Sequence, residues 1–422
     1  MSASVAIVGA GISGLVAAHG LQKRCRLTVF EGEGRIGGHT HTVAVERGGR
    51  TYGIDTGFIV FNYETYPRFT ALLEVLGVES QPSVMSFSVR DEGSGLEYRA
   101  SNLNTMFAQR RNIMKLGMYR LIADIFRFRR ASVALVAGGG SGERLGEYLR
   151  RERYSAFFIS HFIVPMGAAI WSASTRATLE MPAFFFAKFF HNHGFLRVKG
   201  QPEWRVIKGG SCAYLGPLTA GFGECIRRGT PVERIERHEA YVLVRPRGGA
   251  AERFDYVVIA AHADQALRML ADATPQEREI LGAFAYQEND VVLHGDTRMM
   301  PRARRAWASW NYHLVGDAAR RVAVSYNMNI LQSIPFDEHF IVTLNRGEEI
   351  GAEKVERRMV YAHPMYTHEG IAAQGRWGEI NGVRRTYYCG AYWGNGFHED
   401  GVVSGERAAA ALGARLANDK KS

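Results

Sequence analysis

The sequence predicts an α/β fold, in which a domain built on a parallel sheet is joined to a second domain of mixed α+β structure. Three observations predict it. Residues 4–31 have the pattern of strand, glycine turn, helix and strand, and residues 394–409 that of a glycine loop opening a helix. Between them, apolar segments from residue 291 to residue 345 alternate like the strands of an antiparallel sheet.

The turn at residues 9–14 has the glycine spacing of a dinucleotide-binding site. Gly9 permits the tight turn, Gly11 lets a pyrophosphate approach the backbone, and Gly14 lets the helix pack closely on the strand. The N-terminus of the following helix attracts phosphate. Glu31 ends the second strand, where its carboxylate can accept hydrogen bonds from ribose hydroxyls. The unit predicts a Rossmann-type domain and leaves NAD and FAD both open.

The residues after Glu31 favour FAD. Flavoproteins of the amine oxidase and phytoene desaturase superfamily add an R-x-G-G-R-x-x-[ST] extension after the ribose acid. This chain is similar to it at Arg35, Gly37, Gly38, His39 and Thr40. The doubled glycine brings a second backbone segment against the cofactor. His39 stands where that pattern usually has arginine.

A second cofactor motif lies near the other end of the chain. A strand over residues 385–391 leads to the glycine loop and helix at residues 394–409. They resemble the E-G-[AV]-x-x-[SG]-G-x-x-A-A segment of flavin amine oxidases. In that family the helix N-terminus points at the N1/C2=O edge of the flavin, and its positive dipole end stabilises the reduced cofactor. Tyr392 replaces the acid usual at its position.

The predicted cofactor-binding residues come from these motifs and three further segments. The further segments are a D-x-G stretch within residues 51–58, a strand at residues 231–235 and a buried strand over residues 254–261 that ends in small residues. The full set is Gly9, Ala10, Gly11, Ile12, Ser13, Gly14, Glu31, Gly32, Arg35, Gly37, Gly38, His39, Thr40, Gly57, Phe58, Ile59, Val232, Ala260, Gly390, Ala391, His398, Glu399, Asp400, Gly401 and Val402.

The amino-acid composition limits the classes of partner that we expect the protein to bind. The hydrophobic content of 46% and charged content of 22% are those of a folded protein, and the net charge of +10 suggests an anionic partner. No nucleic-acid module is recognisable, so nucleic acid is not expected. The four scattered cysteines fit a reducing cytosol. No run reaches the roughly eighteen apolar residues of a membrane span, so we expect a cytoplasmic protein, either soluble or peripheral at the inner face of the cytoplasmic membrane.

Residues 109–130 predict a basic amphipathic helix. Apolar residues alternate there with seven cations, against the single acid Asp124. Such a helix can lie on an anionic membrane surface. The alternative is an ordinary surface helix with one face in the core, and the sequence leaves both open.

Aromatic residues supply the substrate candidates. Phenylalanine is concentrated at residues 184–195, which suits either the wall of a long apolar cavity or dense packing between helices. His191 and His193 have no third ligand cluster beside them, so no metal site is predicted. The predicted substrate-binding residues are Trp171, Phe185, Phe189, Tyr312 and Trp393.

Several further strings resemble a bacterial family of FAD-dependent oxidoreductases that act with cyclopropane fatty acid synthase-like methyltransferases. They include residues 37–40, 55–62, 169–172, 309–312 and 388–394. The flavin domain fused to plant cyclopropane fatty acid synthases resembles this family too, and a histidine at position 39 fits it. One branch desaturates methyl-branched phospholipid acyl chains on the way to furan fatty acids. The resemblance therefore implies a lipid dehydrogenase with a methyltransferase partner.

The mechanism that this resemblance implies takes a hydride from the acyl chain to the flavin and a proton to a base. The sequence does not identify the base; Tyr392 and His398 are the candidates nearest the flavin by motif, and His41 is a third. The electron acceptor, oxygen or quinone, is also undetermined. Three other functions stay open: a conventional amine oxidase, a redox-neutral fatty acid isomerase, and a flavoprotein that assists a methyltransferase.

The order of the motifs predicts that the chain passes twice through each domain. We expect the FAD-binding domain at residues 1–77, 200–262 and 378–422, and the substrate domain at residues 78–199 and 263–377. The substrate domain is expected to carry an antiparallel sheet and helices.

Overall fold

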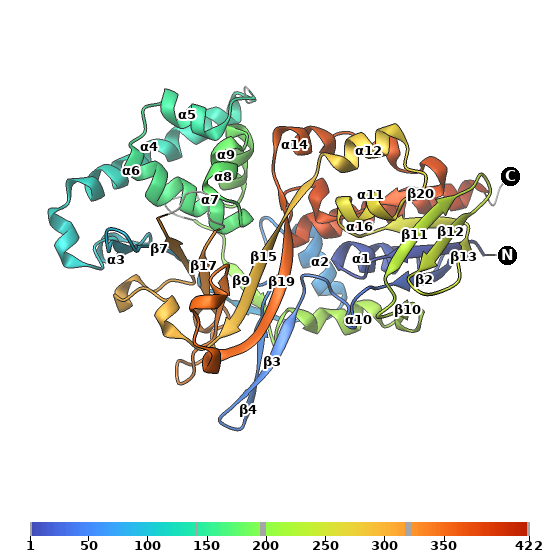
Figure 1. The fold of residues 1–422 in the computed structure, drawn as a ribbon, viewed down its shortest axis with the longest axis horizontal. Coiled ribbons are helices and arrows are strands. Elements are labelled where there is room, and N and C mark those ends of the chain that lie inside the picture. The colour runs from blue at the N-terminus through green and yellow to red at the C-terminus, as the bar shows by residue number, and fades with distance from the viewer. Residues whose placement is uncertain (1, 140–141, 195–199, 317–321, 420–422) are drawn as a thin grey trace.

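The computed structural model describes residues 2–139, 142–194, 200–316 and 322–419. Figure 1 shows two lobes side by side, with both termini on the lobe at the right. The right-hand lobe holds the parallel sheet and the left-hand lobe a larger sheet with helices above it. Among the described helices, none is long and apolar enough to cross a membrane.

The sheet of the first lobe has five strands in the order β10-β2-β1-β14-β20, and all its pairs are parallel. Its strands β1 and β14 are apolar along most of their length because helices and a second layer cover both faces. The predicted strands at residues 4–8 and 27–30 are confirmed, and those within residues 254–261 and 385–391 are found as shorter strands. The bounds are β1 (Ser4–Val8), β2 (Arg26–Phe30), β10 (Ile226–Arg227), β14 (Tyr256–Ile259) and β20 (Thr386–Tyr388).

Helices α1 (Ile12–Leu21) and α16 (His398–Asp419) pack against each other on one face of this sheet. Glycine makes the contact close, because a Cβ atom at Gly405 would lie 2.5 Å from the carbonyl oxygen of Ser13. The two predicted cofactor motifs, from opposite ends of the chain, therefore meet at the N-termini of neighbouring helices.

The other face of the sheet carries a three-stranded antiparallel layer and two helices. These are β11 (Val232–Arg237), β12 (Val242–Pro246), β13 (Glu252–Phe254), α11 (Ala263–Met269) and α12 (Pro275–Gly282). Ala263, Ala266 and Leu281 share a core with Val257 and Ile259 of β14. The packing thus joins α11 and α12 to the first lobe, whereas the sequence division assigned residues 263–377 to the second domain.

The second lobe is built on a mixed seven-stranded sheet in the order β19-β15-β18-β17-β16-β7-β8. Every pair is antiparallel except β16 with β7, which is parallel. The alternating strands predicted between residues 291 and 345 are found here, together with a hairpin formed by β7 and β8. The bounds are β7 (Phe87–Asp91), β8 (Glu97–Arg99), β15 (Ala285–His294), β16 (Trp310–Leu314), β17 (Val324–Asn327), β18 (Ile341–Leu344) and β19 (Val355–Met365).

Helices cover one end of the second lobe. They are α3 (Leu103–Met106), α4 (Leu116–Ala137), α5 (Leu145–Arg151), α6 (Ala156–Phe158), α7 (Val164–Trp171), α8 (Thr175–Glu180) and α9 (Ala183–Asn192). Phe186 and Phe190 of α9 are buried in this helical core with Phe128 and Phe158. Dense packing therefore accounts for part of the phenylalanine run. Phe195, its last member, lies outside the described residues.

Shorter elements complete the two lobes and the segments between them. They are β3 (Thr42–Arg47), β4 (Arg50–Asp55), β5 (Phe61–Asn62), α2 (Pro67–Val75), β6 (Ser80–Pro82), β9 (Trp204–Ile207), α10 (Leu215–Thr219), α13 (Met328–Leu331), α14 (His368–Gln374) and α15 (Trp377–Ile380). The apolar spacing of residues 63–77 is that of a helix with one buried face. The helix begins only at Pro67, a residue favoured in the first helical turn because it needs no hydrogen-bonded N–H.

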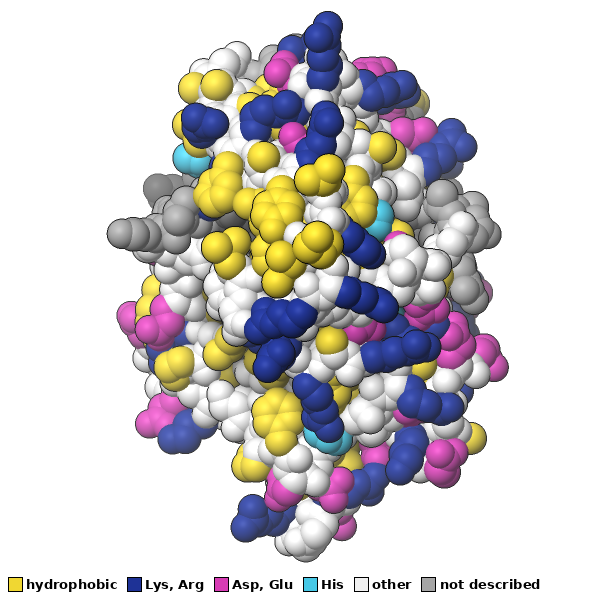
Figure 2. All heavy atoms as spheres, turned by 90° about the vertical axis from the view of Figure 1, so that its left-hand side faces the viewer, with side chains coloured by type: hydrophobic (Ala, Val, Ile, Leu, Met, Phe, Trp, Pro, Cys, Tyr) yellow, Lys and Arg dark blue, Asp and Glu magenta, His cyan; other side chains and the backbone are white. Residues whose placement is uncertain are grey.

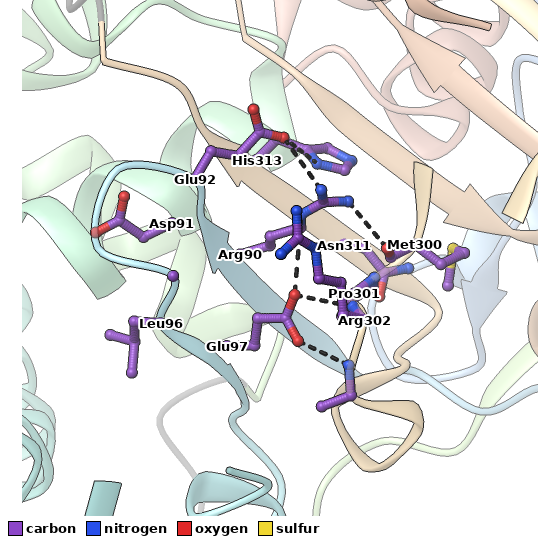
Figure 3. A network of polar contacts seen from close by, with 12 residues as sticks. Arg90, Asp91, Glu92, Leu96, Glu97, Met300, Pro301, Arg302, Asn311 and His313 are labelled. Atoms are coloured by element: carbon purple, nitrogen blue, oxygen red, sulfur yellow. Dashed lines mark hydrogen bonds and ion pairs between the residues drawn. The ribbon is translucent and has the colours of Figure 1, made fainter. Parts of the chain in front are cut away.

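A polar network holds the β7–β8 edge of the sheet to the loop before β16 (Figure 3). Arg90 donates to the carbonyl oxygen of Met300 at 3.0 Å. The carboxylate of Glu97, buried on β8, accepts from the backbone N–H groups of Arg302 and Ala303 at 2.8 and 2.7 Å. Hydrogen bonds to a charged acceptor are stronger than neutral ones, so this edge of the sheet is firmly held to the loop.

Candidate active site

A cavity of about 960 Å³ runs from the glycine turn of the first lobe into the second lobe. Most of the predicted cofactor-binding residues line it, although they come from six separate stretches of the chain. Those in its wall are Gly9, Gly11, Ile12, Ser13, Glu31, Gly32, Arg35, Gly37, Gly38, His39, Gly57, Phe58, Ile59, Val232, Ala260, Gly390, Ala391 and His398.

The glycine turn leaves open space where a ligand would approach. A Cβ atom at Gly14 would lie 2.0 Å from the carbonyl oxygen of Gly9, and one at Gly9, where φ is +104°, would lie 2.7 Å from that of Ala260. At Gly11 a Cβ atom would meet nothing within 4 Å. Gly9 and Gly14 are therefore required by close packing, whereas Gly11 keeps the cavity free. Helix α1 also begins without a side-chain cap, so its first N–H groups are available to phosphate.

The carboxylate of Glu31 is oriented by the turn itself. One oxygen accepts from the backbone N–H of Ala10 and the other from that of Glu33, both at 2.8 Å. The second glycine segment lies directly against the first, because the N–H of Gly37 donates to the carbonyl oxygen of Ala10 at 2.8 Å. A dinucleotide fits this arrangement, with its pyrophosphate over Gly11 and its ribose beside Glu31.

Seven predicted cofactor residues lie behind the wall rather than in it: Ala10, Gly14, Thr40, Glu399, Asp400, Gly401 and Val402. Glu399 accepts from the backbone N–H groups of Arg68 and Phe69 at 3.0 and 2.9 Å, so its carboxylate caps α2. Asp400 accepts from the backbone N–H of Phe397 at 2.9 Å. Of the predicted residues at the N-terminus of α16, His398 is the one that lines the cavity.

His39 belongs to a group of rings in the cavity wall that the sequence did not predict. Its ring centroid lies 5.3 Å from that of Tyr361, 5.4 Å from that of His363 and 6.0 Å from that of His262. Burial, together with the neighbouring histidines, holds the pKa of His39 well below its usual range. Where the superfamily pattern has an arginine cation, this cavity wall therefore presents a neutral imidazole at pH 7.

The Nε2 atom of His39 is buried and has no hydrogen-bond partner among the described residues. His262 lies three residues after the end of β14, so its position beyond the carboxyl end of a parallel strand was a signal for a site residue. His363 offered no such signal because its strand, β19, was not predicted.

None of the three base candidates is a strong base in this structure. His398 shares Nε2 between the hydroxyl groups of Thr40 and Tyr214 at 2.9 and 3.1 Å, and burial lowers its pKa to about 3. Burial likewise lowers the pKa of His41, which lies outside the cavity wall, to about 4. Burial raises the pKa of Tyr392 well above its usual range. Because general bases work best with a pKa near the operating pH, their catalytic role stays a prediction.

Aromatic side chains dominate the part of the cavity in the second lobe. Of the predicted substrate-binding residues, Trp171 and Phe189 line it, whereas Phe185 lies behind the wall, stacked on Tyr366 with ring centroids 4.9 Å apart. Tyr312 is buried in the helical core, and Trp393 packs on Tyr392 and Phe284. Aromatic wall residues that the sequence analysis missed are Trp310, Tyr326, Tyr366 and Phe397. Within the described ranges, no three His, Cys, Asp or Glu side chains are grouped to hold a metal ion.

Comparison with known proteins identifies the class. Residues 12–292 match the family of flavin containing amine oxidoreductases, and the chain belongs to this family. The protein is accordingly an FAD-dependent oxidoreductase with the fold that the sequence predicted. The comparison with curated proteins finds no match.

Solved structures share the fold along nearly the whole chain. Cyclohexylamine oxidase from Brevibacterium oxydans is 17% identical with a TM-score of 0.68, covering 99% of this chain and 100% of that one. Putrescine oxidase bound to putrescine is 15% identical with a TM-score of 0.69, covering 98% and 100%. A fatty acid isomerase from P. acnes is 16% identical with a TM-score of 0.67, covering 98% of each chain. At these identities the likeness concerns the fold alone.

Proposed function

We propose that this oxidoreductase dehydrogenates phospholipid-linked fatty acyl chains, methyl-branched or related to cyclopropane chains, in unsaturated or furan fatty acid modification. The observation that carries the proposal is the apolar and aromatic wall of the cavity in the second lobe. A long apolar chain gains free energy by leaving water for such a wall, at roughly 0.8 kcal/mol per buried CH₂.

The lining of this end supports an uncharged ligand. It includes Met85, Ala169, Ile170, Trp171, Phe189, Val291, Trp310, Tyr326 and Leu344. Glu288 is the single carboxylate among the described residues that line the second-lobe part of the cavity, and its side chain is exposed. A cationic amine would lack a buried acid to pair with, so the wall favours an acyl chain over an amine.

The protein's own residues orient the acyl chain and exclude water from it. When bound, FAD provides the oxidant that accepts a hydride from the substrate. The substrate also releases a proton, so two hydrogens leave the acyl chain and one double bond forms. Trp171 and Phe189 exclude water from the acyl chain. The neutral imidazole of His39 can accept or donate a hydrogen bond at this wall without adding charge.

Amine oxidation is the main alternative, because cyclohexylamine oxidase and putrescine oxidase share the fold. An aromatic cage around the flavin, as an amine oxidase would need, could be built here from Tyr392 and Trp393. Tyr392 lines the cavity here, but Trp393 stands outside its wall. Fatty acid isomerisation, as in the P. acnes enzyme, would use the same apolar cavity without net oxidation.

Lipid analysis separates these functions. A bacterial host would make the protein alone, with a cyclopropane synthase-like methyltransferase, or with an inactive methyltransferase. We expect acyl chains that have lost two hydrogens only where both active proteins are made. Double bonds that move without loss of hydrogen would indicate isomerisation. Unchanged lipids, together with amine-dependent peroxide formation by the purified protein, would refute the proposal.

A further inference from the structure

The outer side of helix α4 carries apolar side chains where a surface helix ordinarily carries polar ones. Its inner side packs Met118, Leu121 and Phe128 into the helical core, as the surface-helix alternative predicted. The outer side nevertheless presents Leu116, which is 84% exposed, and Phe126, which is 49% exposed. Helix α4 therefore has one apolar face that is buried in the core and a second apolar face that is exposed to water.

The apolar surface extends beyond α4. We define the α4 face as the exposed side chains of Leu103, Ile113, Met114, Leu116, Tyr119, Phe126 and Val133. Figure 2 looks at this end of the molecule and shows apolar side chains gathered at its centre, with Lys and Arg side chains above and below them. A contiguous exposed apolar patch of this kind marks an interaction site.

The charges around the α4 face have one sign. The exposed cations without an ion pair to a described residue are Arg110, Arg111, Lys115, Arg120 and Arg130, while Arg127, also exposed, pairs with Asp124 at 3.4 Å. The one acid of this segment, Asp124, is 5% exposed and accepts from the hydroxyl of Ser155 at 2.6 Å. Its charge is thus directed inward, away from this surface.

A neighbouring loop enlarges the basic border. The short helix η6 (Arg304–Ala306) lies against α3 and β8, and Arg302, Arg304 and Arg305 are exposed there. The buried carboxylate of Glu97 fixes this loop through the backbone of Arg302, as Figure 3 shows. The cations of the loop are therefore held beside α3 in a defined position.

An anionic bilayer matches both properties of this surface. Apolar side chains enter the boundary between headgroups and acyl chains, while Lys and Arg reach the lipid phosphates. A second copy of the chain would match only the apolar part, because a two-fold contact brings the same cations face to face. A neutral protein surface would leave those cations without counter-charges as water is removed.

We propose that the α4 face docks the protein on the surface of an anionic phospholipid bilayer. The inference deepens the proposed function, because it names the source of the acyl chain, but it is argued from surface chemistry alone. Helix α4 packs on α9, and Phe189 of α9 lines the cavity. One layer of helix therefore separates the docked surface from the cavity wall.

Vesicle co-sedimentation of the FAD-loaded protein tests the proposal. We expect binding to vesicles of phosphatidylglycerol and phosphatidylcholine, and little to phosphatidylcholine alone. The combined variant Lys115→Gln, Arg120→Gln and Arg130→Gln should lower the partition coefficient about a hundredfold, since each cation near an anionic surface contributes roughly fivefold. Bound flavin, read by its visible absorbance, reports whether each variant is folded.

A matched control variant removes three positive charges from a different part of the surface. Lys23, Arg228 and Arg278 are exposed on the first lobe without ion pairs to described residues. Changing these three to glutamine should leave vesicle binding within about twofold of the original. The double variant Leu116→Ser and Phe126→Ser, which keeps every cation, should weaken binding to the same vesicles.

Three results would overturn the docking surface: equal binding to neutral and anionic vesicles, an equal loss in the control variant, or a dimer that the two serine substitutions dissociate. The proposed function can fail separately. Dehydrogenation of acyl chains in detergent micelles without vesicle binding would remove the docking surface and keep the reaction. Vesicle binding without acyl-chain oxidation would keep the docking surface and remove the proposed reaction.

Discussion

Alanine is expected to act in opposite ways at two glycines of the same turn. At Gly14 the new Cβ atom would lie 2.0 Å from the carbonyl oxygen of Gly9. That oxygen belongs to the backbone of the turn, so it cannot move away without opening the turn. At Gly11 the new Cβ atom would meet nothing within 4 Å, and the residue borders the cavity.

The magnitudes follow from these contacts. Overpacking of this kind costs about 1–3 kcal/mol, so Gly14→Ala should lower the free energy of unfolding and the flavin content together. Gly11 has φ −75° and ψ 177°, which alanine adopts without strain. Gly11→Ala should therefore leave the flavin-free protein as stable as before, or more stable by about 0.4–1 kcal/mol. Its Cβ atom would nevertheless occupy the space that the pyrophosphate needs.

The assay combines flavin content with thermal unfolding, each measured with and without added FAD. We expect Gly11→Ala to unfold at an unchanged temperature without FAD and to lose the stabilisation that added FAD gives. If Gly11→Ala bound FAD as the original protein does, the cavity beside Gly11 would not be the pyrophosphate site. If Gly14→Ala were as stable as the original, the close-packing argument would fail.

Three further predictions concern a buried ion pair of the first lobe, the cavity wall and the acid at the ribose site. Burial alone would raise the pKa of Glu277, but hydrogen bonds, first from Arg237, lower it to about 2, below the ordinary 4.5. Ionised Glu277 therefore stabilises the fold by about 3 kcal/mol above about pH 4.5, and this stabilisation is lost as the pH falls toward 2. In urea unfolding at a series of pH values, Glu277→Gln should reduce the fall in the free energy of unfolding over this acidic range. Ile170→Trp, which narrows the cavity, should keep the flavin and slow acyl-chain oxidation at least about tenfold, whereas Phe184→Trp, outside the wall, should not. Glu31→Gln should weaken FAD binding about tenfold or more in a fluorescence titration, because a charged acceptor is lost.

The parts of the site predicted from sequence are those that short-range geometry fixes. The turn from Gly9 to Gly14 and the acid at Glu31 lie within one strand–helix–strand unit, where spacing alone determines position. The C-terminal motif also predicted a helix, and small residues such as Gly405 permit the close contact of that helix with α1.

Side-chain direction was harder to predict. Glu399 belongs to the C-terminal motif, yet its carboxylate caps α2, and Thr40 holds His398 rather than facing the cavity. A motif fixes the residue type, whereas the direction of the side chain depends on partners that are distant in sequence. For Glu399 those partners are the backbone N–H groups of Arg68 and Phe69.

The histidine group was missed because tertiary structure assembles it. His39, His262 and His363 come from a loop, the end of a parallel strand and an edge strand. That edge strand, β19, contains charged residues such as Arg357 and Arg358. Edge strands tolerate charge because one side faces water, so its sequence lacks the apolar alternation by which the other strands were found.

The central claim is that the cavity brings a lipid acyl chain to bound FAD, and anaerobic reduction of the flavin tests it most directly. The FAD-loaded protein would be mixed, without oxygen, with micelles of phospholipid carrying methyl-branched unsaturated chains, and separately with primary amines. We expect the visible absorbance of oxidised flavin to disappear with the phospholipid, and the recovered acyl chain to lack two hydrogens. Bleaching by the amines alone, with no change in the lipid, would contradict the account.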